Sequence, residues 1–119
     1  MFQTATRLNR GKPVELVREA ARRVPPLRAL YERHVTRNGG EVLPYIFFMD
    51  AAAWAERSRI THFDDVRILI DLLAKAMSSG DESLATLVAL GFVENLGEET
   101  PLEPMLVGPL LRYNDKRTK

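Results

Sequence analysis

The segment from Leu84 to Val93 constrains the fold more than any other part of the sequence, because it contains ten consecutive residues without a charge. Its leucine, valine, alanine and phenylalanine side chains occupy every face of a helix. A helix that is apolar all round lies inside a domain. We therefore expect a central helix near 82–96 with no solvent-facing side. Gly91 is costly in an exposed helix, so it indicates close packing against a second helix.

Proline and glycine divide the first half of the chain into further helical segments. Pro13 suits the first turn of a helix, and Pro25-Pro26 ends that helix and can open the next one. Asn38-Gly39-Gly40 is a strong helix stop. A third helix is expected from Pro44 to Ser58, although Leu43–Met49 alone also has the composition of a buried strand.

Capping patterns mark the helices of the second half. Thr61–Asp64 has the pattern of a capping box, and an amphipathic segment follows it as far as Met77. Ser79–Glu82 is a second capping box that opens the central helix, and Gly97 is its expected C-terminal cap. A last short helix is expected over 102–113, interrupted by Gly108-Pro109.

These patterns predict an all-α protein, a single compact bundle of five to six helices. Its length of 119 residues fits one domain. We expect one helical domain over residues 1–119, with residues 1–11 and 114–119 loosely held.

Several functional classes lack their sequence signatures. The chain has no cysteine, no P-loop, no HExxH and no GxGxxG motif. His34 lies on an apolar helical stripe, which is typical of a structural histidine. We therefore expect no catalytic residues, no cofactor, no metal and no small-molecule substrate. No run of about 18 apolar residues and no signal peptide is found, so we expect a cytoplasmic protein without a membrane partner.

The net charge of +1 conceals a strong asymmetry along the chain. Residues 1–40 hold nine basic and three acidic side chains, whereas residues 41–111 hold four basic and twelve acidic ones. We expect the acidic half to face a partner. The alternative is that these acids only balance the basic first third within the fold. The candidate partner-binding acids surround the exit of the central helix: Glu94, Glu98, Glu99 and Glu103.

Two residues of the third helix can extend this surface if they reach solvent. Asp50 falls on the same helical face as Phe47 and Trp54. A carboxylate beside an apolar seam needs a partner or lies at an opening. We expect either an arginine partner from the first two helices or a contact point for another protein. Asp50 and Trp54 therefore join the candidate partner-binding residues.

Several short motifs carry a resemblance to a known family. They are Glu41-Val42-Leu43-Pro44-Tyr45, Phe48-Met49-Asp50 with Trp54, Ser79-Gly80-Asp81-Glu82 and Phe92-Val93-Glu94-Asn95-Leu96. In this order they resemble a family of small all-helical bacterial proteins of uncharacterised function, similar in size and setting to immunity proteins of polymorphic toxin systems. Gly91 departs from the serine that the family pattern carries before the phenylalanine. The family provides no agreed site residues to carry over.

The resemblance, the size and the missing catalytic motifs together suggest an immunity protein. Such a protein would bind a cognate toxin and neutralise it by occluding its active site. The alternative is a nucleic-acid-associated or regulatory helical module that uses the basic N-terminal third. No aromatic platform or helix-turn-helix signature accompanies these arginines, so nucleic acid is not the expected partner.

Overall fold

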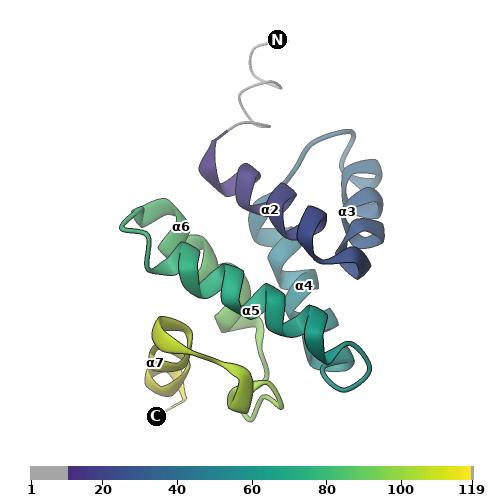
Figure 1. Cartoon of the computed structure of the whole chain (residues 1–119). Coiled ribbons are helices and arrows are strands. Elements are labelled where there is room, and N and C mark those ends of the chain that lie inside the picture. Colours follow the sequence, from purple (N-terminus) through teal and green to yellow (C-terminus); the bar gives the residue numbers. More distant parts are fainter. Residues whose placement is uncertain (1–10, 119) are drawn as a thin grey trace.

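The computed structural model describes residues 11–118, which form six α-helices and no strand (Figure 1). The expected all-α bundle is therefore confirmed, and the strand alternative for Leu43–Met49 is wrong because a helix begins at Pro44. The α-helices are α2 (Lys12–Arg23), α3 (Pro25–Arg37), α4 (Pro44–Ser58), α5 (Phe63–Met77), α6 (Glu82–Thr86) and α7 (Gly108–Arg117). Among these described residues, no helix is both long and apolar enough to cross a membrane.

Three shorter helical turns complete the second half of the chain. α6 continues directly into η1 (Leu87–Phe92), a π-helical segment, and then into the 3₁₀ turn η2 (Val93–Asn95). A second 3₁₀ turn, η3 (Glu103–Met105), lies between this composite helix and α7. The expected single helix near 82–96 thus changes its hydrogen-bond register twice. The Asn95 amide donates to the Leu90 and Gly91 carbonyl oxygens at 3.1 and 2.9 Å, which satisfies two acceptors at the end of the π-helical segment.

The composite helix is central, but its burial is incomplete. Leu87, Val88, Phe92 and Val93 have no exposed surface. Leu90, however, is 48 % exposed, so the expectation that this segment has no solvent-facing side is wrong. The wider π-helical turn does not bury every position, although each residue in it is uncharged.

Gly91 brings the composite helix and α4 close together, as its position in the sequence predicts. A Cβ at Gly91 would lie 3.5 Å from Cδ1 of Tyr45 and 3.6 Å from Cβ of Phe48. It would also lie 3.3 Å from Cδ1 of Leu87, which is tighter than ordinary van der Waals contact. α4 therefore packs directly against Gly91, with Phe48 fully buried at the contact, while the side chain that a Cβ would crowd is Leu87 of the same helix.

His34 has the structural role that its position in the sequence predicts, because its ring Nε2 accepts a hydrogen bond inside the fold. Its side chain is buried, and Nε2 accepts a hydrogen bond from the Leu43 N–H at 2.9 Å. The ring packs edge-on against Phe47 at 5.8 Å between centroids. Burial lowers the pKa of His34, an effect that Asp50 partly opposes and Arg37 reinforces. This contact links α3 to the residue that precedes α4.

Local capping differs from the sequence expectation at two helix starts. His62 precedes α5 without a side-chain cap, so the Thr61–Asp64 capping box does not form. At α6 the N-cap is Asp81, whose carboxylate accepts from the Leu84 N–H at 3.1 Å. Gly97 does not cap the central helix, because η2 ends at Asn95 and Leu96 follows in extended conformation.

The C-terminal region departs most from expectation. Gly108 and Pro109 begin α7 instead of interrupting a helix, because proline is tolerated in the first turn. α7 continues to Arg117, and Asn114 within it is only 3 % exposed. The prediction of a loose segment over 114–119 is therefore wrong for residues 114–117. The other segment expected to be loose, residues 1–11, lies outside the described residues except for Gly11.

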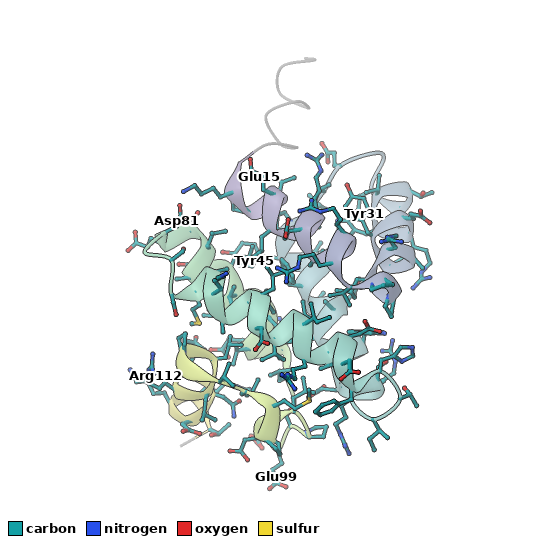
Figure 2. The ribbon with its side chains drawn as sticks, in the orientation of Figure 1. Glu15, Tyr31, Tyr45, Asp81, Glu99 and Arg112 are labelled. Atoms are coloured by element: carbon teal, nitrogen blue, oxygen red, sulfur yellow. The ribbon has the colours of Figure 1, made fainter. Side chains whose placement is uncertain are left out.

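The two basic N-terminal helices and the loop that carries Glu98 and Glu99 lie at different ends of the molecule. Figure 1 places α2 and α3 at one end of the molecule, with the segment between η2 and α7 at the other. Figure 2 shows Glu15 and Asp81 in the half that contains α2, and Glu99 in the opposite half together with Arg112. Charges of both signs therefore lie at each end: Lys12 pairs with Asp81 beside α2, and Arg117 of α7 binds the loop that carries Glu98 and Glu99.

Candidate functional site

A loop held rigidly against α4 carries most of the candidate acids. The Glu56 carboxylate of α4 accepts hydrogen bonds at Oε2 from the Gly97 N–H at 2.8 Å and from the Thr100 hydroxyl at 2.7 Å. The Thr100 hydroxyl oxygen in turn accepts from the Leu102 N–H at 3.1 Å. One carboxylate thus fixes both ends of the segment that contains Glu98 and Glu99, and Thr100 is buried beneath it.

α7 holds the same loop from its other side. Arg117 donates from Nη2 to the Gly97 carbonyl oxygen at 2.9 Å and from Nε to Asn114 Oδ1 at 3.0 Å. Because Asn114 is buried, the guanidinium is anchored to a fixed side chain while it binds the loop backbone. The loop is therefore braced between α4 and α7, which leaves it little freedom to rearrange.

The braced loop forms one wall of an open pocket of about 520 Å³, here called the acidic pocket. Its lining residues are Glu98, Glu99, Thr100, Glu103, Asn114 and Thr118. Glu98, Glu99 and Glu103 are all exposed, and none of them forms an ion pair or a side-chain hydrogen bond with another residue in the 11–118 range. The structure therefore brings three of the candidate acids together and leaves their carboxylates free for a ligand.

The other candidate residues lie elsewhere or are already engaged. The Tyr113 hydroxyl donates to Glu94 Oε2 at 2.6 Å, and this hydrogen bond raises the pKa of Tyr113. Trp54 is buried at 8 % exposure and does not reach the surface. Asp50 is half-buried on the side of α4 that faces His34, and no arginine of the described chain pairs with it. The expected arginine partner for Asp50 is thus wrong within this range.

The acids of the pocket form no ion pair with the basic side chains of residues 11–40. Within residues 11–118 the ion pairs are Lys12 with Asp81, and Arg22 and Arg23 with Glu19. The two arginine pairs lie inside α2, and the lysine pair joins α2 to the start of α6. None involves Glu98, Glu99 or Glu103, so no direct ion pair within this range engages these three carboxylates.

An apolar groove lies on the other side of the same loop. Arg59, Ile60, Phe63, Pro101, Pro104 and Met105 line this space of about 420 Å³, here called the apolar groove. Ile60 is 73 % exposed and Phe63 is 48 % exposed. Sequence reasoning missed these residues, because Ile60 and Phe63 flank a helix boundary where no periodic pattern identifies a surface.

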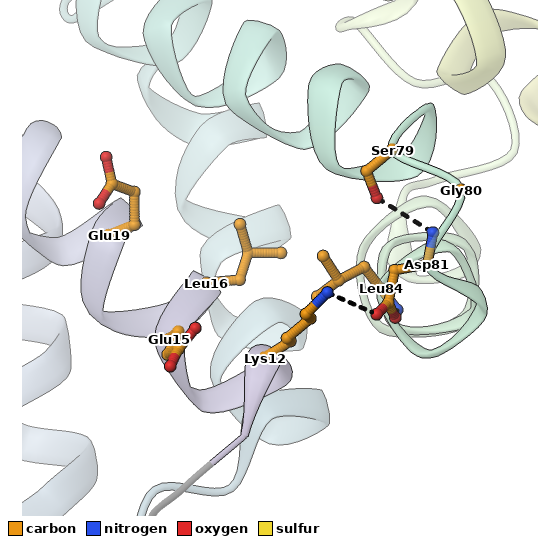
Figure 3. Close-up of a pocket in the computed structure, with 8 residues that line it drawn as sticks. All are labelled: Lys12, Glu15, Leu16, Glu19, Ser79, Gly80, Asp81 and Leu84. Carbon is orange, nitrogen blue, oxygen red and sulfur yellow. Dashed lines mark hydrogen bonds and ion pairs between the residues drawn. The ribbon is translucent and has the colours of Figure 1, made fainter.

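Another pocket lies between α2 and the start of α6, and the charged residues that line it serve the fold (Figure 3). Lys12 pairs with Asp81 across it at 3.2 Å. Hydrogen bonds from Ser83 and from the Leu84 N–H, with further help from Lys12, lower the pKa of Asp81 to about 2. This carboxylate therefore serves as the cap of α6 and as a bridge to α2.

The basic helices offer a shallower surface. Glu32, Arg33, Thr36 and Arg37 line an open depression of about 350 Å³ on the exposed face of α3. Within the described chain, neither arginine forms an ion pair there. This surface contains no aromatic side chain on which a nucleic acid base could stack.

Across residues 11–118 no three His, Asp or Glu side chains form a group that could hold a metal ion. No protein-family model, no curated protein and no solved structure matches the chain. The resemblance drawn from its short motifs therefore stays a prediction.

Proposed function

We propose that this protein is an immunity protein, which binds a cognate bacterial toxin and neutralises it by covering the toxin's active site. The observation that carries the proposal is the braced acidic loop. Glu98, Glu99 and Glu103 share one pocket, their carboxylates have no ion-pair partner among residues 11–118, and Glu56 and Arg117 fix the backbone beneath them.

The arrangement favours binding to a basic surface. Many toxins cleave nucleic acids or act on other anionic substrates, and their active sites tend to be basic. Carboxylates on a rigid loop imitate the charge of such a substrate and steer the encounter. Because the loop is already ordered, little conformational entropy is lost when the partner binds.

The proposal assigns no chemistry to the immunity protein itself. Inhibition would be steric: the acidic pocket docks against the toxin and prevents substrate from entering. The toxin would meet this inhibitor in the cytoplasm of the producing cell, before export or after delivery by a neighbouring cell.

A second candidate function rests on two arginines of α3 that form no ion pair with other residues in the described part of the chain. Arg33 and Arg37 project from an exposed face and could bind phosphate groups. Fluorescence anisotropy with a labelled DNA duplex and with single-stranded RNA tests this candidate. Binding that falls steeply with salt and is lost on replacing both arginines with glutamine would favour it over the immunity function.

Co-expression tests the main proposal. The toxin to test is the C-terminal domain of any large secreted protein that sequencing finds encoded beside the gene for this chain. We expect the toxin domain alone to arrest growth, co-expression of this chain to restore it, and the two proteins to co-purify. Growth arrest that persists with this chain present at equal abundance would refute the proposal.

A further inference from the structure

The apolar groove exposes more hydrophobic surface than the packing of the domain requires. Ile60 and Phe63 lie at the end of the α4–α5 connection, and Pro101, Pro104 and Met105 face them from the loop around η3. Ile60 is 73 % exposed and Phe63 is 48 % exposed, so the fold leaves much of their apolar surface in water, and their grouping marks a contact surface.

The apolar groove and the acidic pocket share one segment of chain. Along residues 98–105, Glu98, Glu99 and Glu103 line the acidic pocket, whereas Pro101, Pro104 and Met105 line the groove. The segment is therefore a ridge with carboxylates on one side and apolar carbons on the other. Because Glu56 holds Thr100 in the middle of this ridge, the two sides keep a fixed spacing.

We propose that the two hollows form one docking surface for a segment of a partner protein that places a basic side chain near a large apolar one. The apolar side chain enters the groove against Phe63, and the lysine or arginine crosses the ridge into the acidic pocket. This inference rests on the proposed function, because it specifies the chemistry by which the partner is recognised.

Charge complementarity selects this occupant and its direction. On one side of the ridge, three carboxylates without an ion-pair partner in the described part of the chain attract a cation. On the other side, Arg59 lines the groove and repels a cation that approaches there. The partner's basic group therefore lies on the acidic side, and an uncharged side chain fills the groove. The buried apolar side chain supplies most of the affinity, and the charge pair supplies orientation.

Defined peptides test the surface without the toxin. The probes are acetylated peptide amides in which one arginine and one tryptophan are separated by one to four glycines. Two matched sets replace the arginine with glutamate or the tryptophan with alanine. Titration into the ¹⁵N-labelled full chain maps binding through amide shifts. We expect the best arginine–tryptophan peptide to shift amides of both residues 59–63 and residues 98–105.

We expect both replacement sets to bind about tenfold or more weakly, equivalent to about 1.4 kcal/mol each. Ile60→Ser and Phe63→Ser should abolish the shifts and keep the native circular dichroism spectrum. Ile46→Ser is the matched control, because Ile46 is 43 % exposed near the other end of α4 and should leave binding unchanged.

Three results of the binding experiments, and one growth result, would overturn the inference. The first is equal binding of the glutamate and arginine peptides, and the second is an Ile46→Ser effect as large as that of Ile60→Ser. The third is concentration-dependent dimerisation that Phe63→Ser removes, which would make a second copy of this chain the occupant. Growth rescue by the Phe63→Ser variant at wild-type strength would leave the immunity function standing and overturn only this docking surface.

Discussion

The Glu56 carboxylate of α4 accepts a hydrogen bond from the backbone N–H of Gly97, 41 residues further along the chain, at 2.8 Å. The same oxygen accepts the Thr100 hydroxyl, so one side chain sets the conformation of the loop that carries Glu98 and Glu99. The position of the free carboxylates therefore depends on a residue that takes no part in the proposed contact.

The first prediction concerns this brace. Glu56→Ala removes the acceptor for two donors, so the buried Thr100 hydroxyl loses the acceptor for its proton and keeps only the Leu102 N–H. We expect the free energy of unfolding to fall by about 1–3 kcal/mol. Urea denaturation measures this change, and hydrogen exchange should show faster exchange at the Gly97 amide.

Two variants make the test of Glu56 specific. Glu56→Gln keeps a carbonyl acceptor and should recover part of the lost stability. Glu99→Gln changes an exposed carboxylate without a hydrogen-bond partner in the described chain, so its stability should stay within about 0.5 kcal/mol of the wild type. Equal stability of Glu56→Ala and the wild type would show that the loop is not braced by this residue.

A second prediction uses the uneven burial of the π-helical segment. Leu87 is fully buried, so Leu87→Ala should lower the free energy of unfolding by about 2–5 kcal/mol. Leu90 is 48 % exposed three residues later, and Leu90→Ala should cost much less. Both substitutions replace leucine with alanine in the same π-helical segment. The difference between their losses of unfolding free energy, measured by heat or urea, therefore reports the difference in burial. Equal losses at both positions would contradict the register of the π-helical turn.

A third prediction follows from the buried His34 ring. Because Nε2 accepts the Leu43 N–H, the fold favours the neutral ring, and burial lowers the pKa of His34 from its ordinary value of 6.5. Between 6.5 and the lowered value the unfolded chain binds more protons than the folded one. The free energy of unfolding should therefore fall as the pH drops through this window.

Urea midpoints measured between pH 8 and pH 5 check the His34 prediction. His34→Gln removes the titrating group and should flatten the pH dependence, although it also lowers stability at neutral pH. His62→Gln is the control, because His62 is exposed at the start of α5 and should leave the pH dependence in place. A His34→Gln protein with the wild-type pH profile would show that another group causes the acid sensitivity.

Much of the fold follows from local sequence signals. Proline marks three helix starts in the sequence, at Pro13, Pro25 and Pro44. It fits the first turn of a helix, and it ends a helix that precedes it in the chain. Gly91 likewise identifies the close approach of two helices before any coordinates are known. Such signals depend on only a few neighbouring residues, so they can be read without knowing the tertiary contacts.

The remaining features depend on contacts between distant residues. No local pattern indicates that Glu56 will meet Gly97, or that Asn114 will be buried beneath Arg117 in a charged C-terminal segment. The π-helical turn also leaves no trace in the apolar pattern, because it changes which carbonyl oxygen each N–H meets without changing composition. Sequence reasoning therefore identified the acids of the pocket and missed the residues that hold them.

The last prediction tests the charge of the acidic pocket directly. Glu98→Lys with Glu99→Lys adds two units of charge per substitution and raises the formal net charge from +1 to +5. Both side chains are exposed and unpaired within the described chain, so the melting temperature should hardly change. Association with the toxin should slow, affinity should fall about tenfold or more, and the salt dependence of the association rate should weaken.

Glu15→Lys with Glu32→Lys is the control, because it adds the same net charge on α2 and α3. It should leave binding nearly intact, which separates a local contact from a general effect of charge. Stopped-flow kinetics at several salt concentrations measures each rate. Unchanged affinity after reversal of Glu98, Glu99 and Glu103 together would refute the acidic interface, and a loss confined to the control pair would move the interface to the basic helices.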